Sequence, residues 1–186
     1  MQENIVKDRN GMQVIDIIHV ALMGALICIA TMVINIRTYN GYVHLGDSMV
    51  LLSTVLLRRK KAIFSSVLGM GLADILLGSP LWAPFTIVIK ALMALIATLI
   101  VGEKNRFKLW REIVGFSLGA IWMVVGYFFA GAIIKHFIEG IPTFTAALGV
   151  ASLDIPGNIV QGSVGTIIAI FLAIALKNVK LFKEQL

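Results

Sequence analysis

The chain contains 186 residues, of which 59% are hydrophobic and only 14% are charged, and its mean hydropathy is +0.93. Water-soluble domains carry about a quarter charged residues, so this composition excludes an ordinary soluble domain and indicates an integral membrane protein. The single cysteine excludes an internal disulfide framework and a multi-cysteine zinc or iron–sulfur site. The length fits one membrane domain over residues 1–186.

The apolar runs predict an all-α fold with six transmembrane helices, because a spanning helix needs about 20 predominantly apolar residues. In chain order the predicted helices cover residues 14–36, 48–57, 62–77, 84–101, 113–134 and 155–176. The second and third runs are shorter than a full span. We therefore expect them to extend into the flanking residues, to tilt, or to be shielded by protein.

The basic residues predict the orientation of the chain. With both termini in the cytoplasm, 13 of the 16 Lys and Arg residues lie on cytoplasmic segments, and only Arg37, Lys90 and Lys135 lie elsewhere. This distribution follows the positive-inside rule and needs an even number of crossings, which supports the short second helix. The basic loops are explained by orientation and by contact with anionic lipid, and they give no support for nucleic-acid binding.

Three stretches on the predicted outer side are long, polar or rich in glycine and proline, at residues 37–47, 78–82 and 135–154. Long structured loops are usually functional rather than simple spacers. The inner loops are short and basic by comparison. This asymmetry favours a protein whose ligand arrives from outside.

Two charged residues are predicted at membrane depth, where charge is costly and therefore informative. Asp74 lies near the end of the third helix and Lys90 near the start of the fourth. With a rise of 1.5 Å per residue, both lie about 8–9 Å below the outer boundary. They form a buried ion pair that fixes helix packing, or they face a water-accessible cavity and contact a ligand, and both can hold together.

Other polar side chains near the outer boundary have two interpretations each. Asn158 and Gln161 share one helical face and either bind a neutral polar ligand or hydrogen-bond between helices. His44 and Asp47 precede the second helix, where Asp47 can cap it or both can reach a ligand. Trp82 belongs to an interfacial aromatic belt or offers a stacking face for a planar ligand.

The sequence lacks a Walker-type phosphate loop, a paired-histidine zinc motif and a nucleophile elbow. We therefore expect no catalytic residues, no bound metal and no cofactor. A solute carrier of this kind would need an external motor.

Four segments carry a resemblance to a known family: ALMGA at 21–25, YVHLGDS at 42–48, GLADILLGSPLWAPFTIVIKALMALI at 71–96 and DIPGNIVQ at 154–161. Together they resemble the S component, the substrate-binding subunit, of energy-coupling factor (ECF) vitamin transporters. YVHLGDS and PGNIVQ are most similar to the branch described as hydroxymethylpyrimidine or pyridoxine carriers, whose broad domain family is often labelled riboflavin-type.

The resemblance implies a subunit in a prokaryotic cell membrane that lacks ATPase activity of its own. It would work with a transmembrane coupling (T) subunit and two ATP-binding subunits, and it would bind a small vitamin from outside. Ala21 and Ala25, small residues four apart, would contact the coupling subunit. The implied vitamin-binding residues are His44, Asp47, Trp82, Lys90, Asn158 and Gln161.

Several alternatives remain open at this point. Riboflavin or pantothenate could be the cargo of the same kind of carrier. An intramembrane enzyme could use Asp74, His44 or His136 as an acid or base, and it would form a product. A ligand-free structural subunit would use the Asp74–Lys90 pair and Asn158 only for packing.

Overall fold

Helices make up almost all of the computed structural model, which describes residues 14–37, 42–102 and 108–177. The α-helices are α1 (Val14–Val33), α2 (Gly46–Leu56), α3 (Arg59–Leu76), α4 (Ala83–Val101), α5 (Leu109–Ile133), α6 (Phe144–Ala151) and α7 (Ile155–Lys177). A short hairpin of β1 (Asn35–Arg37) and β2 (Tyr42–His44) joins α1 to α2. A π-helical turn (Ile134–Ile138) extends α5, and a 3-10 turn (Ser152–Asp154) joins α6 to α7.

Within the described residues, four helical stretches are long and apolar enough to cross a membrane. They are Val14–Val33, Ala83–Val101, Leu109–Ile138 and Phe144–Lys177. The α2 helix is apolar but short, and α3 carries charged residues in its first turn. The fold is therefore that of an all-helical integral membrane protein, while six crossings and cytoplasmic termini stay predictions.

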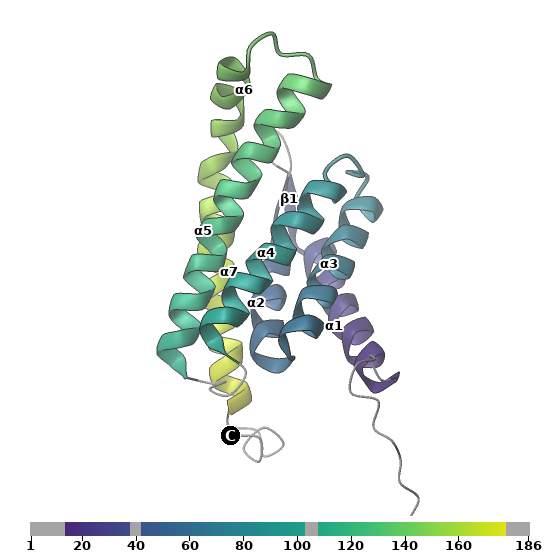
Figure 1. The fold of residues 1–186 in the computed structure, drawn as a ribbon, viewed down its shortest axis with the longest axis vertical. Coiled ribbons are helices and arrows are strands. Elements are labelled where there is room, and N and C mark those ends of the chain that lie inside the picture. The colour runs from purple at the N-terminus through teal and green to yellow at the C-terminus, as the bar shows by residue number, and fades with distance from the viewer. Residues whose placement is uncertain (1–13, 38–41, 103–107, 178–186) are drawn as a thin grey trace, which may run out of the picture.

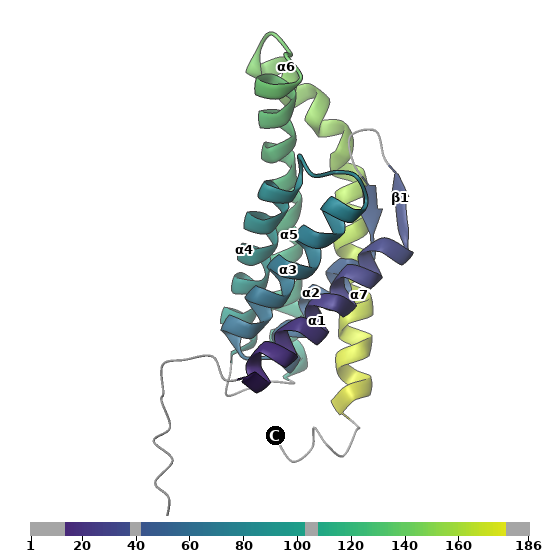
Figure 2. The same ribbon diagram turned by 90° about the vertical axis from the view of Figure 1, so that its right-hand side faces the viewer.

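The positions of the helix ends show which loops lie at the same end of the bundle. Both ribbon views show that α1 begins and α7 ends at the same end of the bundle as the turn between α2 and α3 (Figures 1 and 2). At this end Lys61 on α3 forms a 2.9 Å ion pair with Asp16 on α1. The hairpin, the turn between α3 and α4, and α6 lie toward the other end (Figures 1 and 2). Lys7, Arg9, Lys104, Arg106, Lys180 and Lys183 lie outside the described residues.

The core is built from side chains of α1 to α5 and α7, with Ile27, Leu51, Met70, Met93 and Phe116 fully or almost fully buried. Many large apolar side chains on the outer faces of the same helices are exposed. An apolar exterior of this extent is expected where lipid, rather than water, surrounds the bundle.

Two close approaches of the backbone depend on glycine. A Cβ added at Gly69 on α3 would lie 2.5 Å from the carbonyl oxygen of Gly24, so α1 and α3 cross backbone to backbone. A Cβ added at Gly46 would lie 1.9 Å from Thr31 Oγ1. The chain can therefore pass from the hairpin into α2 against α1 only with glycine at this position.

Several helix boundaries differ from those expected from hydropathy. The first helix ends at Val33 instead of residue 36. Just after this end, the Asn35 side chain donates a hydrogen bond to the Met32 carbonyl oxygen at 2.6 Å. The helices expected to start at 48, 62 and 113 start at 46, 59 and 109. The first turns of α2 and α3 hold small, polar or basic residues, and the first turn of α5 includes Arg111. Basic stems can cover apolar surface while the charge stays at the interface. The stretch 135–154, predicted to lie on the outer side, contains α6, which was not predicted.

Candidate functional site

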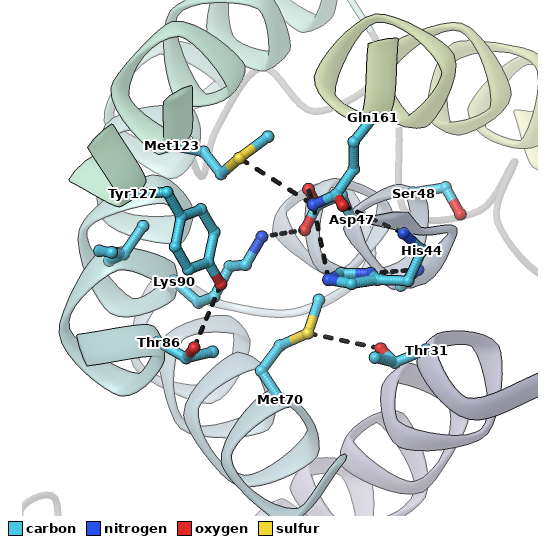
Figure 3. Close-up of polar contacts among 12 residues, drawn as sticks. Thr31, His44, Asp47, Ser48, Met70, Thr86, Lys90, Met123, Tyr127 and Gln161 are labelled. Carbon is cyan, nitrogen blue, oxygen red and sulfur yellow. Dashed lines mark hydrogen bonds and ion pairs between the residues drawn. The ribbon is translucent and has the colours of Figure 1, made fainter. Parts of the chain in front are cut away.

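Buried polar side chains gather where β2, α2, α4, α5 and α7 meet (Figure 3). We call His44, Asp47, Lys90, Tyr127 and Gln161 the polar cluster. The side chains of Asp47 and Lys90 are both 0% exposed, and His44 and Gln161 are buried as well. Buried polar groups of this kind need partners, since an unpaired one is costly.

Asp47 is the centre of the cluster. Lys90 Nζ forms an ion pair with Asp47 Oδ1, and Gln161 Nε2 donates to Asp47 Oδ2 at 2.8 Å. Lys90 Nζ also lies 5.1 Å from the centre of the Tyr127 ring, within the range of a cation–π contact. Figure 3 shows Lys90 and Tyr127 on one side of Asp47, with Gln161 and His44 on the other.

The expected pairing of Asp74 with Lys90 is corrected by this geometry. Lys90 pairs with Asp47, while Asp74 Oδ1 accepts a hydrogen bond from the Tyr42 hydroxyl. Matched depth on consecutive helices was the basis for the expectation. Depth alone does not determine the direction of a side chain around its helix. Asp47, at the start of α2, approaches Lys90 from another element.

His44 connects the hairpin to α7. Its backbone N–H donates to Gln161 Oε1 at 3.0 Å, and the Gly46 N–H donates to His44 Nδ1 at 3.1 Å. An accepting Nδ1 places the proton of a neutral imidazole on Nε2. Nε2 lies 3.5 Å from Gln161 Nε2, which is itself a donor. The hydrogen-bond pattern therefore leaves the Nε2–H of His44 as a donor that can serve a ligand.

Burial lowers the pKa of His44 to about 4, although the charge of Asp47 acts in the opposite direction. The unfolded chain has an ordinary histidine pKa of about 6.5. Between these values the unfolded state binds more protons than the folded state. The stability contributed by the neutral His44 is therefore complete above about pH 6.5 and is lost as the pH falls toward 4.

We expect His44→Asn to flatten this pH dependence, because asparagine does not titrate and its side-chain oxygen can replace the accepting Nδ1. The measurement is the unfolding temperature of detergent-solubilised protein at several values between pH 7.5 and 4.5. His19→Asn, on the exposed side of α1, is the matched control. Equal pH slopes for wild type and His44→Asn would contradict the assignment.

The other sequence-predicted residues lie at different distances from the cluster. Trp82 is half-buried and tilts against Tyr127, with ring centres 6.1 Å apart, so it adjoins the cluster through that ring. Asn158 is half-buried and lies one turn before Gln161, and its side chain makes no hydrogen bond to the described part of the chain. His44, Asp47 and Gln161 are thus in direct contact, whereas Asn158 is not.

Two residues were not singled out from the sequence: Tyr127 in the polar cluster and Tyr42 beside it. Tyr127 interrupts an apolar run on α5 and donates to Thr86 Oγ1 at 3.2 Å. Tyr42, on β2, packs its ring against His44 with centres 5.5 Å apart. The sequence signal that could have identified Tyr42 and Tyr127 is a tyrosine hydroxyl in otherwise apolar surroundings, because a buried hydroxyl usually has a hydrogen-bond partner.

A separate groove of about 320 Å³ lies between α5 and α7. It includes no member of the polar cluster. Its lining is Ser117, Ala120, Ile121, Val124, Ile159, Gly162, Ser163, Thr166 and Ile167.

The small residues expected to contact a coupling subunit lie on an open face of α1. Ala21 and Ala25 are exposed, next to Leu22 and Leu26, which are 61% and 52% exposed. Met23 and Ile27 face the core instead. The exposed face has the small side chains that close helix packing requires, and its partner stays a prediction.

Comparisons with known proteins place this arrangement in a family. Residues 11–178 match the family described as the S component of ECF-type riboflavin transporters. An uncharacterised protein of Pyrococcus woesei is 35% identical over 103 residues, which are 54% of this chain and 68% of that protein. A solved structure of the S component of a bacterial ECF transporter has the same fold, with a TM-score of 0.67 and 22% identity, over 90% of this chain and 98% of that one. The chain therefore belongs to the family of ECF-type riboflavin transporter S components, substrate-binding membrane subunits that work with the T and ATPase modules of ECF transporters.

Proposed function

We propose that the polar cluster binds a small heteroaromatic vitamin or precursor, of the hydroxymethylpyrimidine or pyridoxine type, that arrives from outside the cell. The observation that carries the proposal is the Gln161 carboxamide, which joins the hairpin to Asp47 beside a buried lysine. A coupling subunit contacting the Ala21–Ala25 face, together with two ATP-binding subunits, then drives delivery to the cytoplasm of a prokaryotic cell.

The composition of the site supports a small ring with few polar groups. Binding sites for such molecules combine apolar and aromatic walls with a few placed donors and acceptors. Trp82 and Tyr127 supply aromatic surface, and the Nε2–H of His44 supplies a donor. Lys90 and Gln161 contribute further donors once a ligand competes for their present partners.

The test is direct binding by detergent-purified protein, with mass spectrometry of the small molecules that purify with it. Hydroxymethylpyrimidine, pyridoxine, riboflavin and pantothenate are compared by equilibrium titration. Stoichiometric binding of either of the first two, without product formation, supports the proposal. Binding only of riboflavin or pantothenate would change the cargo, product formation would indicate an enzyme, and no thermal shift with any of them would favour a structural subunit.

Gln161→Ala is expected to weaken vitamin binding by about 1–3 kcal/mol, because it leaves buried partners unpaired. The partners are Asp47 Oδ2 and the His44 backbone N–H. Asn158→Ala is expected to have a smaller effect, because the Asn158 side chain lies one turn away and makes no hydrogen bond to the described residues. Titration of both folded variants with the same vitamin measures the difference. Unchanged affinity in the folded double variant would remove α7 from the site.

A further inference from the structure

Asp74, near the end of α3, has a carboxylate oxygen that the described protein does not satisfy. The residue is 4% exposed. Its Oδ1 accepts a hydrogen bond from the Tyr42 hydroxyl, whereas Oδ2 is buried and has no hydrogen-bond partner. The Thr86 hydroxyl lies near this carboxylate, but it does not complete a hydrogen bond to Oδ2. Buried acceptors are almost always paired, so this exception needs an explanation.

The charges around Asp74 do not balance either. Lys90 on α4 forms its ion pair with Asp47 and not with Asp74. The imidazole of His44 is neutral near pH 7, because burial lowers its pKa to about 4. Among the described residues, this region therefore holds two buried acidic side chains, Asp47 and Asp74, and one buried ammonium group. Carboxylates at membrane depth are usually paired or functional.

Two chains of side-chain contacts connect Asp74 to the polar cluster. Tyr42, its hydrogen-bond donor, packs against the ring of His44. Thr86, its neighbour on α4, accepts a hydrogen bond from Tyr127, whose ring covers Lys90. A ligand held by the cluster therefore has the Asp74 carboxylate within its surroundings on the α3 side.

We propose that Asp74 is a specificity-determining residue whose free carboxylate oxygen accepts a hydrogen bond from an amino group or a protonated ring nitrogen of the cargo. The inference rests on the proposed function, and it narrows the substrate class to vitamins with such a donor. When the cargo binds, its donor group forms a hydrogen bond with Asp74 Oδ2 and places a partial or full positive charge next to the carboxylate. A ring of the same size without the donor leaves the oxygen unpaired, which is the strongest form of discrimination available to a buried polar site.

Asp74→Asn tests this assignment. The amide oxygen can keep the hydrogen bond from Tyr42, which turns the amide NH₂ toward the position of Oδ2. An acceptor thereby becomes a donor with almost no change in shape. The probes are 4-amino-5-hydroxymethyl-2-methylpyrimidine and its analogue with hydrogen in place of the 4-amino group.

Wild type is expected to prefer the amino probe by about tenfold or more, the value of one good buried hydrogen bond. Asp74→Asn is expected to lose this preference while it still binds the analogue. Its unfolding temperature without ligand should equal or exceed that of wild type, because an uncompensated buried charge is gone. Asp16→Asn, at the other end of the bundle, is the control and should keep the preference.

Tyr42→Phe provides a second variant that retains the charge. It removes the donor to Oδ1 and lets the carboxylate rotate, so affinity for the amino probe should fall more than affinity for the analogue. If Asp74→Asn keeps the wild-type preference, or loses both affinities equally together with stability, Asp74 is a packing residue and the inference is wrong. If wild type binds neither of these two pyrimidines, nor pyridoxine, riboflavin or pantothenate, the proposed function itself fails.

Discussion

Replacing Lys90 with methionine is expected to destabilise the folded protein by about 3–5 kcal/mol, the usual cost of breaking a buried ion pair by removing one partner. The reason is the environment of Asp47, whose side chain is 0% exposed and would keep only the hydrogen bond from Gln161. Vitamin binding should be lost as well, because the ammonium group and its contact with the Tyr127 ring disappear together. The measurement is unfolding of the detergent-solubilised variant at pH 7, followed by titration with the vitamin.

A double variant separates folding from binding. Lys90→Met combined with Asp47→Asn removes both charges, and replacing a whole buried pair is often neutral for stability. We expect the double variant to recover most of the lost stability and none of the binding. Recovery of both would mean that the pair only holds the helices together.

Lys135→Met is the matched control for a lysine in an ion pair. Lys135 pairs with Glu139 at 2.6 Å, but the Glu139 side chain is 47% exposed. Exposed pairs contribute about 0–1 kcal/mol, so this variant should differ little from wild type. If Lys90→Met and Lys135→Met lower the stability of the folded protein by similar amounts, the distinction between a buried and an exposed ion pair is wrong.

The sequence was informative about the cluster because polar residues at membrane depth are rare. Lys90 was selected on that basis, Gln161 by its place on a helical face near the predicted outer end, and His44 and Asp47 by their place just before the second helix. The structure brings these four residues together. Their partners were less predictable. Asp47 was expected to cap a helix or reach a ligand, and its actual partner is a lysine on α4, 43 residues away in the sequence. Helix rotation, which decides such contacts, depends on packing that a single sequence does not show.

The fold was predictable to a similar degree. Long apolar runs identify α1, α4, α5 and α7. A chain segment surrounded by lipid must pair its own backbone N–H and C=O groups, so such a run is expected to form a helix. The hairpin and α6 were not predicted. The hairpin has strands of 3 residues each, too short for an alternating pattern to be recognised. The α6 helix has only 8 residues and lies in a stretch with glycine and proline nearby.

Replacing Ala21 and Ala25 with leucine is expected to abolish vitamin uptake while it leaves vitamin binding unchanged. Both residues are exposed on α1, and neither belongs to the polar cluster. Stability should also be retained, because the core-facing residues of α1, such as Met23 and Ile27, are untouched. A neighbouring transmembrane helix that packs against small residues is displaced by larger ones, since membrane helices associate mainly through close contact.

The measurement is uptake of labelled vitamin by vesicles that contain the variant together with the T and ATP-binding subunits. A fall of at least about tenfold corresponds to about 1.4 kcal/mol of lost coupling, a modest amount for a disrupted helix interface. Ala175→Leu, an exposed alanine on α7, is the matched control and should transport normally. If the double variant assembles and transports like the control, the coupling subunit docks on another face. If it fails to bind the vitamin, α1 contributes to the site through the Thr31 contact with Met70 and the tight approach to Gly46, and binding and docking are then not independent on this helix.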